Sequence, residues 1–315
     1  MKKNLIRGLT ALLVLAGCLL GFYPITVRES VSINHTLFKI SEQFQTGTAL
    51  SSWYLPFAQL ETVRTLHENK REPIVTDGEN QITASPESPF DINMVCKNGK
   101  EQQKFLFTIR SKGEKDTASV VSLHYNTTYL GKWFTKNKQR ETASESLKNL
   151  KDYMEDTKRF YGFEIVATKV EDTSYFFMTR TVTKGLEWQT LGKLMEELLA
   201  IAEKKEAGHN GVKIFYMLPE EKEVKVFASI GVTKQVFPTS TDIFEYKRMP
   251  FGKNLLMSSY QGKMKEAFKV LKAHERFKND RTLVSMAIPF QRILSDGLYF
   301  KEDDWVQLKI YSPVF

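Results

Sequence analysis

Residues 224–232 read VKVFASIGV, and this stretch decides the fold of the C-terminal half of the chain. Small apolar residues at the even-numbered positions alternate with Lys225, Phe227, Ser229 and Gly231. Strict alternation is typical of a strand with one face in the core. Upstream, apolar residues recur at helical spacing over residues 188–203, and a second alternating run covers residues 211–218. The pattern predicts a helix followed by two strands.

The same order of elements returns about 80 residues further along the chain. In the first copy, the predicted elements cover residues 163–170, 174–182, 188–203, 211–218 and 224–232. In the second copy, they cover residues 241–248, 254–260, 264–271, 282–294 and 304–311. Internal duplication of a strand-helix-strand-strand unit builds two pseudo-symmetric halves. A groove between such halves is a natural site for a small molecule.

The N-terminal half has a different order of elements. Strands are predicted over residues 28–35, 91–95, 104–110, 118–125 and 129–134. Short helices are predicted over residues 36–46 and 50–58, and residues 60–90 are polar and rich in turn formers. Apolar positions then fall on one face over residues 141–156, which predicts a long amphipathic helix. The fold class predicted for both halves is therefore α+β.

The first residues form a separate segment. Residues 8–27 carry no charge and follow Lys2, Lys3 and Arg7, so the positive-inside rule places the folded domains outside the cytoplasm. Three interpretations stay open: a single-pass anchor, a cleaved secretory signal, or a lipoprotein signal in which Cys18 is lipidated. We therefore expect a membrane segment over residues 1–27 and folded domains over residues 28–156 and 157–315.

Composition excludes several classes of protein. The chain has 45 basic and 37 acidic residues, and the surplus of +8 is spread out, so no direct nucleic-acid binding is expected. Two cysteines and five scattered histidines argue against a disulfide scaffold and a metal site. No catalytic or cofactor motif is present, and Cys96 lacks a clear companion histidine. We expect no cofactor and no metal.

The N-terminal half resembles the START-related SRPBCC (polyketide cyclase-like) domains, which have the helix-grip fold. The resemblance rests on residues 32–38, SINHTLF, at the step from the first strand to the first helix, and on residues 51–57, SSWYLPF, in the second helix. It implies an apolar cavity between a curved sheet and the long helix, which would hold a hydrophobic ligand. We expect Trp53 in the second stretch to be a core residue.

The C-terminal half resembles the GyrI-like, or AraC-type, effector-binding domain of bacterial transcription regulators. Three stretches carry the resemblance: residues 260–264 (YQGKM), 288–296 (IPFQRILSD) and 308–314 (LKIYSPV). Drug-binding members of that family hold a buried glutamate in a Pro-x-x-Glu strand, and the position is assigned here to Gln291. A second acidic position, two residues before Tyr311, is Lys309. Loss of the carboxylates favours a neutral or anionic ligand over a cation.

A START-related domain followed by a GyrI-like domain also resembles a recurring bacterial two-domain type. We expect a membrane-tethered protein that binds small hydrophobic or aromatic molecules. Each aromatic candidate also has an alternative role in the core. The expected ligand-binding residues are Tyr175, Phe177, Tyr216, Phe227, Tyr260, Phe290, Gln291 and Tyr311. The alternative function is a hydrolase or detoxifying enzyme that uses Glu187 or Glu164 as acid or base.

Overall fold

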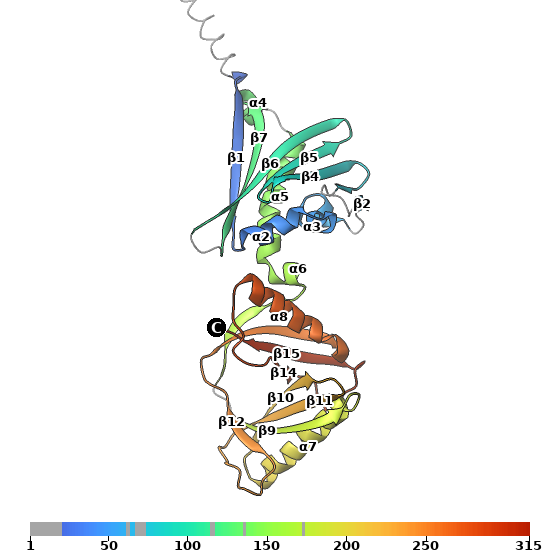
Figure 1. Cartoon of the computed structure of the whole chain (residues 1–315), viewed down its shortest axis with the longest axis vertical. Coiled ribbons are helices and arrows are strands. Elements are labelled where there is room, and N and C mark those ends of the chain that lie inside the picture. The colour runs from blue at the N-terminus through green and yellow to red at the C-terminus, as the bar shows by residue number, and fades with distance from the viewer. Residues whose placement is uncertain (1–20, 61–63, 67–73, 114–116, 135–136, 172–173) are drawn as a thin grey trace, which may run out of the picture. The chain divides into compact units, whose positions relative to one another are not determined.

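The computed structural model describes residues 21–60, 64–66, 74–113, 117–134, 137–171 and 174–315. The chain separates into two compact units, Met1–Asp156 and Thr157–Phe315, here called unit 1 and unit 2 (Figure 1). Both units are mixed α+β structures, and each contains one large antiparallel sheet.

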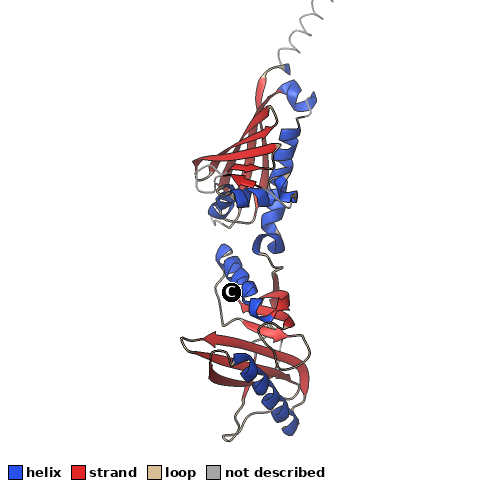
Figure 2. Cartoon of the chain, turned by 90° about the vertical axis from the view of Figure 1, so that its right-hand side faces the viewer, coloured by secondary structure: helices blue, strands red, loops and turns tan. Residues whose placement is uncertain are grey.

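Unit 1 is a seven-stranded sheet in the order β1-β7-β6-β5-β4-β3-β2. The strands are β1 (Pro24–Ile33), β2 (Arg64–Leu66), β3 (Ile74–Thr76), β4 (Asn80–Ser88), β5 (Asp91–Asn98), β6 (Glu101–Ser111) and β7 (Ser119–Thr128). The helices are α2 (Leu37–Ser41), α3 (Gly47–Trp53), α4 (Tyr129–Phe134) and α5 (Lys138–Glu155), with single 3-10 turns over Glu42–Phe44 and Phe57–Gln59. The long helix α5 packs along β1 and β7 (Figure 2).

Aromatic side chains form the core of unit 1 around α3. Trp53 is fully buried, as predicted, and its ring meets Phe44 and Phe107 at centroid distances of 5.0 and 6.2 Å. Its indole Nε1 donates to the Gln43 carbonyl at 3.1 Å. Leu147 on α5 is likewise buried. These aromatic side chains occupy part of the space in which the resemblance implied an apolar cavity.

The first strand begins earlier than predicted, at Pro24 rather than Arg28. Pro24 pairs with Thr128 at the start of an unbroken register between β1 and β7. Residues 24–27 of the expected membrane segment therefore belong to the sheet, and Val27 is buried in it. Residues 1–20, including Cys18, lie outside the described residues. Within the described part of the chain, no helix is both long and apolar enough to cross a membrane.

Two other predictions for unit 1 were wrong. Residues 129–134, predicted as a strand, form helix α4, where the Thr128 hydroxyl accepts a hydrogen bond from the Gly131 amide at 3.0 Å. Residues 60–90, predicted as turn-rich, include β3 and β4. Ile82 and Ala84 are buried on β4, but the polar residues around them hide the alternation in the sequence.

Unit 2 is an eight-stranded sheet in the order β12-β9-β11-β10-β14-β15-β13-β8. The strands are β8 (Val166–Lys169), β9 (Ser174–Thr183), β10 (His209–Pro219), β11 (Glu223–Val232), β12 (Glu245–Arg248), β13 (Asn254–Lys263), β14 (Phe290–Ile293) and β15 (Trp305–Pro313). The helices are α6 (Thr157–Tyr161), α7 (Glu187–Lys204) and α8 (Phe268–Asp280), with a 3-10 turn over Met264–Glu266.

The strand order of unit 2 confirms the predicted duplication. The first copy contains β8 to β11 and the second copy contains β12 to β15. Corresponding strands of the two copies lie at equal distances from the centre of the sheet, where β10 pairs with β14. The first strand of each copy lies at the far edge of the other copy, since β8 pairs with β13 and β12 pairs with β9. The copies are therefore interleaved at their edges, and neither forms a separate sheet.

Both long helices of unit 2 cover the same face of its sheet. Helix α7 packs on β9 and β11, and α8 packs on β13 and β15 (Figures 1 and 2). Phe176 on β9 and Phe215 on β10 point to this side and join the core with Leu194. Because side chains alternate along a strand, Tyr175 and Phe177 project from the opposite face. That face carries the candidate site.

Candidate functional site

A groove runs over the helix-free face of the unit 2 sheet. It consists of a larger hollow of about 610 Å³ and an adjoining hollow of about 240 Å³. The two hollows share the side chains of Val170, Tyr175, Ile214, Met249, Leu255 and Phe290. These shared residues are mostly apolar, so the two hollows form one continuous surface, here called the sheet groove.

Aromatic rings form much of the sheet groove. Tyr216 and Phe227 stack with centroids 4.0 Å apart and an interplanar angle of 16°. Phe290 and Tyr311 stack at 5.0 Å and 19°. The Phe177 ring is covered by the Lys247 ammonium, whose Nζ lies 3.3 Å from the ring centroid. Flat rings held in pairs offer contact area at low conformational cost to a planar apolar ligand.

The structure brings together most of the candidate residues. Tyr175, Phe177, Tyr216, Phe290 and Tyr311 line the groove, and Phe227 lies on the same face beneath Tyr216. Tyr260 and Gln291 do not belong to the site, because both face the helices. The Tyr260 hydroxyl donates to the Lys263 carbonyl at 2.7 Å, and its ring belongs to the helix-side core.

The Gln291 assignment fails by a single residue. Gln291 pairs with Phe215 on one side and Ile310 on the other, both of which are helix-side core residues. Its buried side-chain Oε1 has no hydrogen-bond partner among the described residues. Three residues after Pro289 comes Arg292, so the Pro-x-x-Glu spacing itself selects Arg292. A shift of one residue along a strand moves a side chain to the other face.

Arg292 and Lys309 form a cationic pair in the smaller hollow. They are direct cross-strand neighbours on β14 and β15, and both line the hollow. The buried Nε of Arg292 has no hydrogen-bond partner among the described residues. Burial raises the pKa of the Tyr311 hydroxyl, and the adjacent Arg292 guanidinium opposes this shift. An anion in this hollow would be held by both positive charges.

Further basic residues surround the groove. Lys169 lines the smaller hollow, and Lys247, Arg248 and Lys253 line the larger one, where Lys247 is paired with Glu245 at 3.2 Å. Among the described lining residues of both hollows, the one carboxylate is that of Glu171. The groove therefore combines an apolar floor with a positive field, which attracts an anion and disfavours a cation.

The residues of the enzymatic alternative lie elsewhere. Glu187 is the first residue of α7, and its carboxylate accepts a hydrogen bond from the Gly185 amide at 2.5 Å. Its neighbour Trp188 packs edge-on against Phe215 on the helix side of the sheet. Glu164 offers its backbone carbonyl to the Ser258 hydroxyl. Neither glutamate lines the sheet groove.

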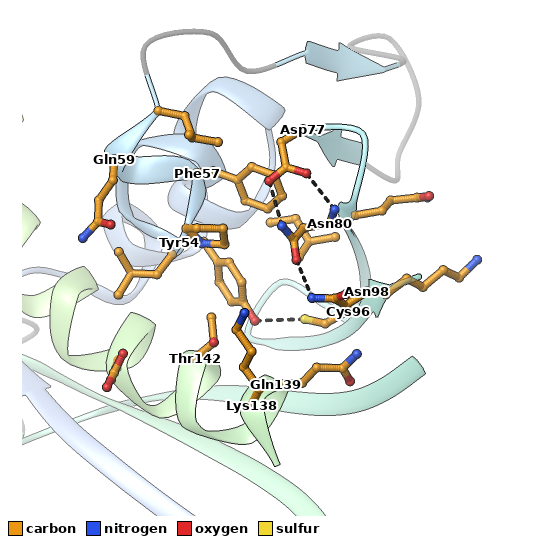
Figure 3. A pocket seen from close by; sticks show the side chains of 17 residues that line it. Tyr54, Phe57, Gln59, Asp77, Asn80, Cys96, Asn98, Lys138, Gln139 and Thr142 are labelled. Carbon is orange, nitrogen blue, oxygen red and sulfur yellow. Dashed lines mark hydrogen bonds between the residues drawn. The ribbon is translucent and has the colours of Figure 1, made fainter. Parts of the chain in front are cut away.

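Unit 1 has a pocket of its own, of about 400 Å³, between α3, the β3–β4 turn, β5 and the start of α5 (Figure 3). The Tyr54 hydroxyl lies 2.9 Å from the Cys96 Sγ. At the rim, Asn80 donates to Asp77 at 2.8 Å and accepts from Asn98 at 2.9 Å. Because these polar groups already satisfy one another, this pocket is the weaker candidate.

The Cys96 thiol in this pocket is expected to be unreactive in the folded protein. Burial raises its pKa to about 12. His124, its conceivable partner, instead contacts the Thr108 hydroxyl at 3.1 Å. A Cys18→Ser variant, with Cys96 as its one thiol, should react with an aromatic disulfide reagent about 1,000-fold more slowly when native than when unfolded in urea. Rapid stoichiometric labelling of the native variant would contradict the buried geometry.

No family model and no curated protein matches the chain. Similar solved structures include EcmrR in a DNA complex, with 12% identity over 56% of this chain and 67% of that chain and a TM-score of 0.41. The Zhui aromatase/cyclase from Streptomyces sp. R1128 has 12% identity over 44% of this chain and 99% of that chain, with a TM-score of 0.31. SAV2435 bound to tetraphenylphosphonium has 15% identity over 48% of this chain and 94% of that chain, with a TM-score of 0.28. All three TM-scores lie below 0.5.

Proposed function

We propose that unit 2 binds an anionic small molecule with a flat apolar body in the sheet groove. The observation that carries this proposal is the cross-strand pair of Arg292 and Lys309, which places two positive charges in the hollow at one end of an aromatic surface. A carboxylate, sulfonate or phosphate would complete the hydrogen bonding of the guanidinium. The apolar body would lie over the stacked rings of Phe290 and Tyr311.

The proposal modifies the sequence-based expectation in one respect. Gln291 was expected to orient a neutral or anionic ligand, but it faces the helices. Arg292 takes its place, and a fixed positive charge selects an anion more strongly than a neutral amide does. In the GyrI-like family that this unit resembles, a buried carboxylate binds cationic ligands. A positively charged side chain at the same position would by the same reasoning bind an anionic ligand.

A matched set of ligands tests this selectivity. Naphthalene-2-sulfonate, 2-naphthalenemethanol and 2-naphthylmethylammonium share one ring system and differ in charge. We expect isothermal titration of the full chain in detergent to show the sulfonate binding at least about 10-fold more tightly than the alcohol, and the ammonium most weakly, because one charge-assisted hydrogen bond contributes about 1.5–3 kcal/mol. Equal affinity for all three, or a preference for the ammonium, would overturn the proposal.

We also infer that the N-terminal segment tethers both units to a membrane. Support comes from the uncharged apolar residues 8–23 behind Lys2, Lys3 and Arg7. A spanning helix and lipidation at Cys18 both give this result, whereas a cleaved signal would release the chain. Flotation of the full chain with lipid vesicles in a density gradient distinguishes a tethered chain from a released one.

A further inference from the structure

Four large aromatic side chains are exposed at one end of unit 1. Phe22, Tyr23, Tyr129 and Trp133 have exposed fractions of 69%, 66%, 55% and 66%. They belong to the residues just before β1 and to helix α4, which lie at the same end of the unit (Figure 1). This group of four residues is here called the aromatic end. An exposed apolar cluster of this size indicates a surface that contacts a partner.

The fold holds the aromatic end together. The backbone amide of Tyr129 donates to the Tyr23 carbonyl at 3.2 Å, where the pairing of β1 and β7 ends. Tyr129 and Trp133 are four residues apart on α4, so they lie on the same side of the helix. Gly21 passes so close to Leu130 that a Cβ at this position would clash with its side chain. The residues just before β1 are thus fixed against α4.

A basic residue accompanies these rings. Lys132 is exposed, and its Nζ lies 5.4 Å from the centroid of the Trp133 ring. Tryptophan and tyrosine with neighbouring lysines are typical of the membrane–water interface, where rings lie at headgroup level and ammonium groups reach anionic lipids. The long lysine stem allows the charge to stay in water while the ring is buried.

The length of the preceding segment points to the same partner. Because β1 begins at Pro24, the uncharged segment before it covers residues 8–23. Because helical structure ends at Gly21, a helix over the uncharged residues 8–21 would extend about 21 Å, which is shorter than the hydrocarbon core of about 30 Å. A spanning segment this short would draw Phe22 and Tyr23 to the bilayer surface. If Cys18 is lipidated instead, only residues 19–23 separate the lipid from β1, with the same result.

We propose that the aromatic end lies on the lipid bilayer surface, with its four rings at headgroup level and Lys132 beside anionic lipids. The inference rests on the tether proposed above, and it adds a specific bilayer-contacting face of unit 1. Under this arrangement unit 1 is seated on the membrane by α4 and the start of β1, and its orientation to the bilayer is defined.

Trp133 itself supplies the probe. We would reconstitute the full chain into vesicles of phosphatidylcholine and phosphatidylglycerol whose acyl chains carry bromine near the headgroup, and then measure tryptophan fluorescence. Bromine quenches a ring only at close range. Trp133→Phe should remove at least about half of the lipid-dependent quenching, since rings at headgroup level lie next to the bromine. The matched control is Trp305→Phe, because Trp305 is equally exposed, at 67%, but lies on β15 of unit 2.

The outcomes separate this inference from the tether. If the chain floats with the vesicles and Trp133→Phe is quenched as strongly as the unmodified protein, the aromatic end does not contact lipid, although the tether stands. If the chain does not float, both the tether and the bilayer contact are wrong. Circular dichroism of both variants checks that each keeps its fold, as expected for substitutions at exposed positions.

Discussion

Replacing Arg292 by glutamate should reverse the charge preference of unit 2. We expect the affinity for naphthalene-2-sulfonate to fall at least about 100-fold, because the variant loses a charge-assisted hydrogen bond and gains a repulsive carboxylate in a partly buried hollow. The ammonium analogue should then bind more tightly than the sulfonate. Isothermal titration of the full chain with both compounds measures the two changes together.

A matched control separates a local effect from a general change in charge. Lys272→Glu makes the same change of two charge units on α8, which covers the other face of the sheet. It should leave both affinities within about twofold, because charges separated by more than about 8–10 Å in solvent are largely screened. If both variants lose sulfonate affinity equally, the effect is long-range and the assignment of Arg292 is wrong.

A milder substitution guards against misfolding at the half-buried Arg292. Lys309→Gln removes the neighbouring charge in the same hollow but keeps a polar side chain of similar size. Sulfonate affinity should fall about 3- to 10-fold, in line with loss of one partly exposed charge. Unchanged affinity in both Lys309→Gln and Arg292→Glu would place the anion elsewhere.

The sequence predicted the order of elements in unit 2, although only residues 290–293 of the predicted strand 282–294 form β14. Alternation over residues 224–232 and its counterpart over residues 304–311 predicted paired strands, because side-chain period and burial are coupled directly. The predicted repeat of about 80 residues appears in the structure as a sheet with the same order from either edge. Strands and internal repeats can be predicted in this way because both leave a regular pattern of apolar and polar residues along a single sequence.

The candidate site was only partly predictable, because alternation does not say which face of a sheet the helices cover. Both Gln291 and Arg292 are polar residues in a central strand, and their neighbours in the sequence do not distinguish the two faces. The answer comes from the register of β14 with β10 and β15, which aligns Gln291 with Phe215 and Ile310. The same problem placed Tyr260 in the site rather than in the helix-side core.

The interior of unit 1 shows a second limit of sequence-based prediction. The resemblance implied a cavity because it reflects the order of strands and helices. Whether that order encloses space depends on the volumes of the side chains that meet there. Here Trp53, Phe44 and Phe107 pack against one another, and each is at most 2% exposed. Only the packed structure shows that these rings converge.

Acid should destabilise unit 2 through His274, which is fully buried on α8. Its Nε2 lies 2.9 Å from the Ser258 hydroxyl, and its Nδ1 lies 2.9 Å from the Ser312 hydroxyl. Ser258 donates its proton to the Glu164 carbonyl at 2.6 Å, so it must accept from Nε2–H, and Ser312 then donates to Nδ1. The neutral imidazole satisfies every group in this arrangement.

Protonation of the neutral His274 imidazole would place a positive charge in the core. Burial, together with the adjacent Lys278 ammonium, lowers the pKa of His274 to about 4, and Glu275 partly opposes this shift. Because the unfolded chain has the ordinary value of about 6.5, it binds more protons than the folded chain between these two pH values. The stabilisation is therefore complete above pH 6.5 and is lost as the pH falls towards 4. Its full size is about 3 kcal/mol.

A His274→Gln variant isolates this contribution, because glutamine does not titrate. Its free energy of unfolding, measured in urea by circular dichroism, should be lower than that of the unmodified protein at pH 7.5. The gap should narrow by about 2–3 kcal/mol between pH 7 and pH 4, since only the unmodified protein must bury or expel a proton. Groups in unit 1 titrate alike in both proteins and cancel in the difference. A gap that stays constant over this range would show that His274 is protonated as easily in the core as in water, which its full burial beside Lys278 opposes.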